Sequence, residues 1–335
     1  MKAIRIERYG GPEVLQRQDV PVPTPSRGEV LVEVAFAGIN FMDVHTRQGK
    51  YEHSRSYRVG IPLTLGMEGS GIVHEIGPDV DGFAVGDRVA WCISWGSYAD
   101  FAVVPAARLA KIPEGIELDL AAAAVFQGCT AHYLSSDVGN LAQGTTCLIH
   151  AASGGIGQLL IQFAKRRGAI VFATTSSREK ADVAKKAGAD QVMLYDEGRF
   201  ADAVRDATGG RGVDVVFDAV GRPTLRDSFR ATRTRGLVVN YGSVAGSLSD
   251  LDPIELGEAG SLFLTRPRLA DHMASAEEVQ MRAADVFAGL LDGSITLSVA
   301  GRYCFDDVEK AHAALEERRQ IGKAVLDLSS SESHV

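Results

Sequence analysis

The sequence is poor in cysteine and in long hydrophobic runs. Its four cysteines are scattered without the paired spacing of a disulfide framework or a zinc lobe: Cys92, Cys129, Cys147 and Cys304. No uninterrupted apolar segment approaches the roughly 20 residues that span a bilayer. The first residues carry charges where a signal peptide has an apolar run. We therefore expect a soluble, unprocessed, cytoplasmic protein that does not bind membranes.

Positive charge is scarce as well. The chain holds 35 Lys and Arg against 43 Asp and Glu, which gives a formal net charge of -8. This balance does not favour nucleic acid or an anionic membrane, so small molecules are the expected partners. Glycine is plentiful, with 36 residues, and 45% of the chain is hydrophobic. These values fit an α/β globular chain long enough for about two domains.

Two styles of sequence follow each other along the chain. Up to about residue 120, short β-rich runs such as 30–34 and 71–76 alternate with Gly, Pro and Asp turn signals. Beyond that point helices alternate with apolar strands, which predicts a parallel sheet covered on both faces. The expected strands are 146–150, 170–174, 191–194, 213–217, 236–240 and 261–265. A helix over 276–291 then leads to strands at 300–304 and 323–327 that rejoin the first domain, and the tail 329–335 looks poorly ordered.

A glycine-rich turn follows the strand at 146–150. It contains Ser153, Gly154, Gly155, Ile156 and Gly157, and an apolar helix over 158–165 comes directly after it. Glycines let the backbone approach phosphate oxygens, and the amides that begin a helix supply donors and partial positive charge. The turn therefore predicts a diphosphate site, with a surface turn that binds no ligand as the alternative.

The end of the next strand lacks the acidic residue that commonly binds the adenosine ribose. Ser176 and Ser177 stand there instead, followed by Arg178 and Lys180. A 2′-phosphate needs donors and positive charge, so NADPH is favoured over NADH, although Glu179 points the other way. Alternatively, Arg178 and Lys180 are solvated charges on the following helix.

Five further motifs accompany the glycine turn. They are AGINFMD (37–43), GMEGSG (66–71), FDAVG (217–221), GSLFLTRP (260–267) and GK (322–323). With them, essentially the whole chain resembles the zeta-crystallin-like quinone oxidoreductases, zinc-free members of the medium-chain dehydrogenase/reductase superfamily. The resemblance implies a GroES-like catalytic domain, residues 1–122 and 267–335, split around a Rossmann domain, residues 123–266, with NADPH between them. It also implies a homodimer in which the strand at 261–265 pairs with its copy.

Two positions argue against a zinc site. Related alcohol dehydrogenases have Cys and His metal ligands where this chain has Asn40 and Met67, and neither replacement is a plausible zinc ligand. Glu68 alone cannot hold the metal. The segment 89–98 crosses the region of the structural zinc lobe with one cysteine, and no histidine pair has the i, i+4 spacing of a helical site. We therefore expect no metal.

Without a Lewis acid, hydride transfer needs an acceptor that is already electron-poor, such as a quinone or an enone. Negative charge then grows on the acceptor oxygen, which requires hydrogen-bond donors. The resemblance implies that Asn40 and Tyr51 line the acceptor pocket, Asp43 organises that loop, and Arg266 contacts the cofactor or the acceptor. Tyr133 is a further candidate donor. His45 stands where bacterial relatives often have Tyr, which leaves the acceptor preference open.

Other residues complete the expected cofactor site. Thr130 is assigned to it, Tyr195 resembles a family tyrosine near the 2′-phosphate, and Asn240 and Gly242 follow a strand whose carboxyl end faces ligands in such sheets. Each site residue also has a structural alternative. Asn40 and Asp43 fit a helix start, Tyr51 and Tyr195 fit packing, and Arg266 fits a surface ion pair.

Two other functions remain open from the sequence. One is an NADPH-dependent reductase of enoyl or enone double bonds, because the same superfamily scaffold serves both reactions. The other is a non-catalytic NADPH-binding protein, as in lens crystallins that resemble this family. The sequence does not separate a dimer from a dimer of dimers, and it does not identify the physiological acceptor.

Overall fold

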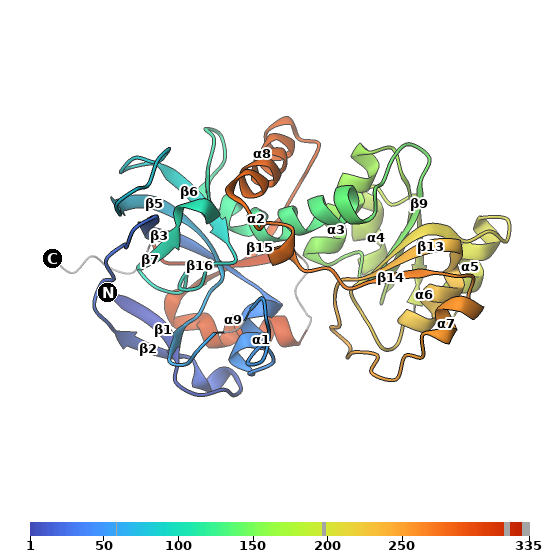
Figure 1. Cartoon of the computed structure of the whole chain (residues 1–335), viewed down its shortest axis with the longest axis horizontal. Coiled ribbons are helices and arrows are strands. Elements are labelled where there is room, and N and C mark those ends of the chain that lie inside the picture. The colour runs from blue at the N-terminus through green and yellow to red at the C-terminus, as the bar shows by residue number, and fades with distance from the viewer. Residues whose placement is uncertain (58, 196–198, 318–321, 330–335) are drawn as a thin grey trace. The chain divides into compact units, whose positions relative to one another are not determined.

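The structure, a computed structural model, describes residues 1–57, 59–195, 199–317 and 322–329. Contacts divide the chain into two compact units, Met1–Cys129 with Ala270–Val335, and Thr130–Leu269 (Figure 1). The division predicted from the sequence differs slightly. It assigned residues 123–129 to the Rossmann domain and residues 267–269 to the GroES-like domain, whereas the contacts place each segment in the opposite unit. Most of the tail that we predicted to be poorly ordered lies outside the described residues.

The first unit is built on two sheets. A small antiparallel sheet joins β2 (Gln16–Asp19), β1 (Lys2–Ile6) and β4 (Leu63–Thr64). The larger sheet has the order β15-β16-β3-β5-β6-β8, with β7 (Phe101–Pro105) also paired to β3. Its other strands are β3 (Glu29–Ile39), β5 (Glu68–Ile76), β6 (Arg88–Cys92), β8 (Leu109–Lys111), β15 (Val299–Cys304) and β16 (Lys323–Asp327). Strand β16 pairs antiparallel with β3, so the last strand of the chain lies against one of the first.

Helices α1 (Phe41–Arg47), α8 (Ala276–Asp292) and α9 (Val308–Glu316) belong to this unit. Helix α1 starts directly after β3, where Asn40 is in extended conformation. Helix α8 is delimited by the signals that its sequence contains: the Ser275 hydroxyl accepts the Glu278 N–H at its start, and Gly293 ends it in the left-handed region at φ 75°. Helix α2 (Leu118–Tyr133) carries the chain from the first unit into the second.

The second unit contains the parallel sheet that the sequence predicts. Its strands have the order β11-β10-β9-β12-β13-β14, and every neighbouring pair is parallel. The bounds are β9 (Thr146–Ile149), β10 (Ile170–Thr175), β11 (Gln191–Leu194), β12 (Val213–Asp218), β13 (Thr232–Asn240) and β14 (Phe263–Thr265). The order reverses between β9 and β12, and ligands of open α/β sheets bind at the carboxyl ends beside such a switch point.

Five helices connect these strands: α3 (Gly155–Arg166), α4 (Arg178–Lys186), α5 (Phe200–Ala207), α6 (Leu225–Ala231) and α7 (Ile254–Glu258). Helix α3 packs against α4, and α5 packs against α6. Figure 1 shows the two pairs on opposite sides of the sheet. Buried Leu148, Phe172, Phe229 and Val238 belong to the core that packs against α5 and α6. The predicted α/β class with a doubly wound sheet is confirmed.

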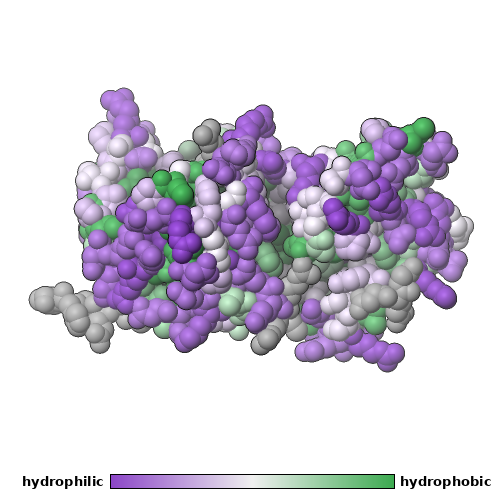
Figure 2. Space-filling view, turned by 90° about the horizontal axis from the view of Figure 1, so that it is seen from below, coloured by the Kyte–Doolittle hydropathy of each residue, from purple (hydrophilic) through white to green (hydrophobic). Residues whose placement is uncertain are grey.

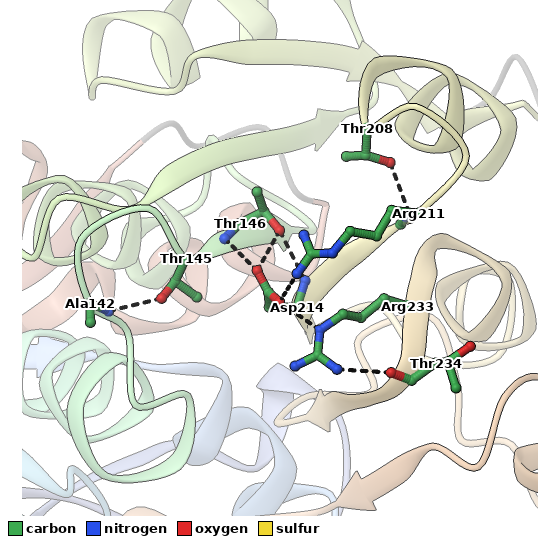
Figure 3. A network of polar contacts seen from close by, with 9 residues as sticks. Ala142, Thr145, Thr146, Thr208, Arg211, Asp214, Arg233 and Thr234 are labelled. Carbon is green, nitrogen blue, oxygen red and sulfur yellow. Dashed lines mark hydrogen bonds and ion pairs between the residues drawn. The ribbon is translucent and has the colours of Figure 1, made fainter.

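A polar network ties the amino-terminal ends of three strands together (Figure 3). The Asp214 carboxylate of β12 accepts hydrogen bonds from the Thr146 N–H of β9 at 2.9 Å and from the Arg233 Nε of β13 at 2.6 Å. It also forms an ion pair with Arg211. Burial alone would raise the pKa of Asp214, but the hydrogen bonds from Arg233 and Thr146 and the charge of Arg211 lower it to about 2.

The surface is largely polar. The face in Figure 2 is mostly hydrophilic, and its hydrophobic residues lie in small separate groups. Large exposed apolar side chains are few and come from distant elements, for example Val85, Phe263 and Leu291. Among the described residues no helix is both long enough and apolar enough to cross a membrane.

Asp214→Asn is expected to lower the free energy of unfolding at pH 7 by about 1–3 kcal/mol, because it removes partly buried charge-assisted hydrogen bonds. The lowered pKa of Asp214 means that its stabilisation is complete above its ordinary value of 3.8 and is lost as the pH falls toward 2. Urea unfolding at pH 7 and at lower pH measures both effects. Asp202→Asn, which removes an exposed partner of Arg230, is the control and should change stability by less than about 0.5 kcal/mol. An equal loss in both variants would contradict the special role of Asp214.

Candidate active site

The glycine turn brings the start of α3 close to the end of β9. The Gly154 N–H donates to the Ala151 carbonyl at 2.9 Å, and Gly154 is the N-cap of the helix. A Cβ at Gly157 would lie 2.5 Å from the Ala151 oxygen and 2.8 Å from the Ala152 Cα. Any larger residue at 157 would push the helix away from the strand. Only glycine allows this close approach.

The predicted diphosphate residues therefore occupy a single turn. Ser153 is buried immediately before it, and Gly155, Ile156 and Gly157 form the first turn of α3. Amides of a first helical turn have no partner within the helix and carry partial positive charge. The turn has the geometry that suits an anion with several oxygens, such as a diphosphate.

Buried His150 anchors this turn to the sheet. Its Nδ1 lies 2.6 Å from the Thr174 Oγ1 and its Nε2 lies 3.0 Å from the Ser228 Oγ. Ser228 in turn donates to the Asp218 carboxylate at 2.9 Å. Burial lowers the pKa of His150, although Asp218 and Asp227 act in the opposite direction. The neutral imidazole thus fixes the residue that directly precedes the turn.

The carboxyl ends of β12 and β13 meet at the same edge of the sheet. The Asp218 carboxylate accepts the N–H groups of Val220 at 2.8 Å and Gly221 at 2.9 Å. The Asn240 amide donates to the Gly242 carbonyl at 2.8 Å. A Cβ at Gly242 would lie 2.5 Å from the Ala219 oxygen, so glycine is again needed for close packing. The loops after these two strands are held tightly against each other.

Arg266 joins this edge from β14. Its Nη1 donates to the Asn240 backbone oxygen at 2.7 Å, while the residue as a whole is exposed. The structure thus brings together three residues that the sequence assigned to contact with the cofactor: Asn240, Gly242 and Arg266. The contact of Arg266 with a backbone carbonyl leaves both its assigned role and the alternative of a surface ion pair open.

The residues expected to bind a 2′-phosphate also lie together, after β10. Ser177 caps α4, and its hydroxyl accepts the Lys180 N–H at 3.3 Å. The Lys180 ammonium donates to the Ser176 hydroxyl at 3.2 Å. The cation of Lys180 therefore contacts the Ser176 hydroxyl, and Ser177 lies beside them as the cap of the same helix. Exposed Arg178 instead lines a cavity of about 380 Å³ beside β11, with Ala181, Asp182, Lys185, Val192 and Leu194.

Three assigned residues lie in less open surroundings. Thr130 and Tyr133 are buried in α2, with 5% and 2% of their surface exposed. Tyr195 follows β11 and packs, partly buried, against the core of the second unit. Its position matches the strand-end packing that the sequence allows as an alternative. Residues 196–198, directly after it, lie outside the described part of the chain.

In the first unit, Asn40 and Asp43 mark the start of α1. The Asp43 carboxylate accepts the Asn40 N–H at 2.8 Å and the Tyr98 hydroxyl at 3.2 Å. Burial raises the pKa of Asp43 to about 7, although the Asn40 N–H and the charge of Lys323 act in the opposite direction. The Tyr98 hydroxyl also lies 3.2 Å from the His312 Nε2, and burial lowers the pKa of His312 to about 3. The buried carboxyl with this raised pKa, Asp43, is therefore directly hydrogen-bonded to the backbone of Asn40.

The Asn40 side chain belongs to a buried cluster that the sequence analysis missed. Lys323 Nζ donates to the Asn40 Oδ1 at 2.5 Å and to the Glu68 carboxylate at 2.6 Å. The Asn40 Nδ2 donates to the same carboxylate at 2.8 Å. In the sequence, Glu68 and Lys323 are charges of opposite sign at the start of otherwise uncharged stretches, GSGIV and AVL. That pattern was the available signal, but it does not pair the two residues.

Tyr51 lies in an aromatic group that follows α1. Its hydroxyl is 3.4 Å from the His45 Nδ1, and its ring centre is 5.5 Å from that of Tyr57. His45 and Tyr51 are both half-buried. Tyr51 therefore combines packing with a polar end next to an imidazole that can exchange protons.

The positions of the absent zinc ligands are buried. The Met67 side chain is fully buried, and both Glu68 oxygens already accept hydrogen bonds, Oε1 from the Phe126 N–H at 2.6 Å. Within the described ranges, no group of three or more His, Cys, Asp and Glu side chains is arranged to hold a metal.

Comparison with known proteins extends over nearly the whole chain. Residues 26–114 match the alcohol dehydrogenase GroES-like domain, and residues 155–283 match the family described as zinc-binding dehydrogenase, a range without positions 40 and 67. Quinone oxidoreductase of Pseudomonas aeruginosa is 36% identical and covers 97% of this chain and 99% of its own. The 2-haloacrylate reductase of a Burkholderia species is 36% identical, over 96% and 97% of the two chains.

The solved structure of Escherichia coli quinone oxidoreductase complexed with NADPH superposes with a TM-score of 0.93 at 34% identity, over 98% of this chain and 100% of the other. Likeness at this level over the full length establishes common family membership, and it confirms the resemblance on which the sequence analysis relied. The chain belongs to the zeta-crystallin-like quinone oxidoreductase family of the medium-chain dehydrogenase/reductase superfamily.

Proposed function

We propose that this protein is an NADPH-dependent oxidoreductase that reduces quinones in the cytoplasm. The observation that carries the proposal is its full-length similarity to quinone oxidoreductases, including one solved with NADPH. The convergence of Ser176, Ser177 and Lys180 independently favours NADPH over NADH. The free thiols of all four cysteines fit a reducing compartment.

The residues of the second unit fit the cofactor. Ser153 and the amides of Gly155, Ile156 and Gly157 would hold the diphosphate, and Ser176, Ser177 and Lys180 would hold the 2′-phosphate. Asn240, Gly242 and Arg266 would line the nicotinamide end, and Thr130 and Tyr195 are assigned to the same cofactor site. When bound, NADPH supplies the hydride.

The acceptor end is assigned to the residues around α1. Both N–H groups of Asn40 are bound within the protein, to Glu68 and to the Gly38 carbonyl at 3.3 Å. The donors to the developing oxyanion would therefore be Tyr51 and Arg266, with Tyr133 as a further candidate. Asp43 would keep its assigned role, because it holds the backbone of Asn40 in place.

We propose further that the reaction needs no zinc. The side chains at the expected ligand positions do not suit zinc: positions 40 and 67 hold a carboxamide and a thioether, and both oxygens of the Glu68 carboxylate already accept hydrogen bonds. Quinones accept hydride without a Lewis acid because they are already electron-poor. A simple ketone would not be reduced efficiently in such a site.

A second candidate function is the reduction of a polarised carbon–carbon double bond. It is favoured by similarity to a 2-haloacrylate reductase and by the Tyr51 hydroxyl, which lies next to His45. Saturation of the double bond needs a proton on carbon, and a tyrosine coupled to an imidazole is suited to deliver it. If quinones, enones and enoyl thioesters all failed as acceptors although NADPH bound tightly, both enzyme proposals would be wrong, and the non-catalytic crystallin-like alternative would be favoured.

A homodimer through strand β14 is part of the proposal. This strand is the edge of the six-stranded sheet, and 63% of the Phe263 surface is exposed. An unpaired edge offers backbone N–H and C=O groups to a second copy of the same strand. Two-fold pairing of such edges extends the sheet across both protomers.

Lys180→Ala is expected to raise the KM for NADPH by about tenfold and to change that for NADH less than twofold, because it removes a charge-assisted contact to the 2′-phosphate. Initial rates with a quinone and each cofactor measure the difference. Lys186→Ala removes the same charge from the exposed last turn of α4 and serves as the matched control. Equal effects on NADPH and NADH would show that Lys180 does not contact the 2′-phosphate.

Tyr51→Phe separates the two acceptor classes. A general acid typically contributes about 10²- to 10⁴-fold, so kcat/KM for an enone should fall by about 100-fold or more. For a quinone we expect a loss below about tenfold, since water can protonate an oxygen. Tyr9→Phe is the control. Tyr9 is a partly buried tyrosine that packs against the hydrophobic core of the first unit. A parallel fall for both acceptors would rule out this division of roles.

Phe263→Lys should convert the dimer to a monomer, because a charge on an edge strand opposes its pairing. Size-exclusion chromatography with light scattering measures the mass against 35.7 kDa for one chain. Val85→Lys, at another exposed apolar residue, should leave the mass unchanged. A wild-type protein that elutes as a monomer would end the dimer proposal.

A further inference from the structure

The ion pair between Glu68 and Lys323 is closed off from solvent. Nζ and Oε2 lie 2.6 Å apart, and the side chains are 0% and 1% exposed. Burial of two charges carries a desolvation cost that is recovered only when the remaining hydrogen-bonding capacity is satisfied. Here it is satisfied, since Glu68 also accepts from the Phe126 N–H, and Lys323 lies over the Phe126 ring at 5.8 Å.

The space around the pair is filled by the backbone of neighbouring elements. A Cβ at Gly38 would lie 2.2 Å from the Glu68 Oε2 and 2.8 Å from the Ala122 oxygen. Glycine at position 38 thus lets the carboxylate lie between β3 and α2. The two side chains have little room to reorient, so they hold any group that hydrogen-bonds to them in a fixed position.

What it binds is the Asn40 side chain. An ammonium can only donate hydrogen bonds, and a carboxylate can only accept them. The amide oxygen must therefore face Lys323 and the amide nitrogen must face Glu68, as the distances of 2.5 and 2.8 Å show. A flipped amide would set its NH₂ against the ammonium and its oxygen against the carboxylate. The pair permits one orientation of Asn40.

That orientation determines where α1 begins. Asn40 is the N-cap of α1, His45 lies on this helix, and Tyr51 follows the helix and lies 3.4 Å from the His45 Nδ1. We propose that Glu68 and Lys323 are positioning residues of the acceptor half-site: they lock the Asn40 amide and thereby fix the direction in which α1 and Tyr51 leave β3. In this role Asn40 fixes the start of the helix and does not donate a hydrogen bond to the oxygen of the acceptor. The kinetic part of this inference rests on the proposed function, and the structural part does not.

The test removes both charges together in the full-length protein, as Glu68→Gln with Lys323→Met, which keeps side-chain length and avoids an unpaired buried charge. Hydrogen exchange of the α1 amides, residues 41–47, should become faster. The value of kcat/KM for a quinone should fall on the order of 10- to 100-fold, as expected for a misplaced site, while the KM for NADPH stays within about twofold.

Asp119→Asn with Arg302→Met is the control, at a pair whose carboxylate is nearly buried and whose guanidinium is exposed. It neutralises another ion pair of the first unit, one that involves α2 and β15 and does not contact Asn40. This control should leave exchange in α1 and quinone kinetics unchanged. Equal acceleration of exchange in the control would overturn the inference, because any loss of a charge pair would then suffice.

Asn40→Ala covers the case in which the double variant does not fold, since it leaves the ion pair intact. It should show the same faster exchange and the same selective loss with the quinone. Wild-type exchange in α1 after either change would overturn the positioning role, whatever the activity. Should the wild-type protein reduce no quinone, the proposed function would fail, and the exchange measurement would still decide the role of the pair.

Discussion

The architecture of the second unit depends on one constraint, the close approach of the chain to itself where strands end. At Gly157 and at Gly242 a single additional carbon would lie 2.5 Å from a backbone oxygen. Both contacts occur at the carboxyl edge of the parallel sheet, and buried His150 and Asp218 fasten the same edge from within. A cofactor site made largely of backbone groups keeps its shape only if these close backbone contacts hold the strand ends in fixed positions.

In the first unit, the residue that follows a strand is held by charged side chains and not by close backbone contacts. Asn40 follows β3, and its side chain is hydrogen-bonded to the buried Lys323 ammonium and the buried Glu68 carboxylate. The Asp43 carboxylate binds the Asn40 backbone N–H. Each unit thus places its functional loop at the end of a strand and fixes the first residue after that strand. The means differ: close backbone contacts at Gly157 and Gly242 hold the second unit's loops, whereas buried side-chain hydrogen bonds hold Asn40 in the first unit.

The sequence predicted the sheet of the second unit well, since each strand contains a short apolar run; β13 starts four residues earlier than predicted, at Thr232, because its first residues are polar and charged. The grouping of Ser176, Ser177 and Lys180 was also predictable, because they are neighbours in the chain. Glu68 and Lys323 were not: they are separated by 255 residues, and they come together only because β3 pairs with both β5 and β16. His150 was missed for a similar reason, since its partners Thr174 and Ser228 lie on other elements. Local patterns reveal elements, but buried polar partners depend on tertiary structure.

The position of β16 between β15 and β3 in the larger sheet has a consequence for biosynthesis. Residues 130–269 form the second unit without any strand from elsewhere, whereas the first unit needs residues 323–327 to complete the sheet beside β3. As the chain leaves the ribosome, the inserted unit can finish its core while the unit that began earlier still waits for its last strand. Lys323, which contacts Asn40, therefore leaves the ribosome after the whole second unit, so β3 can pair with β16 only after residues 130–269 have been made.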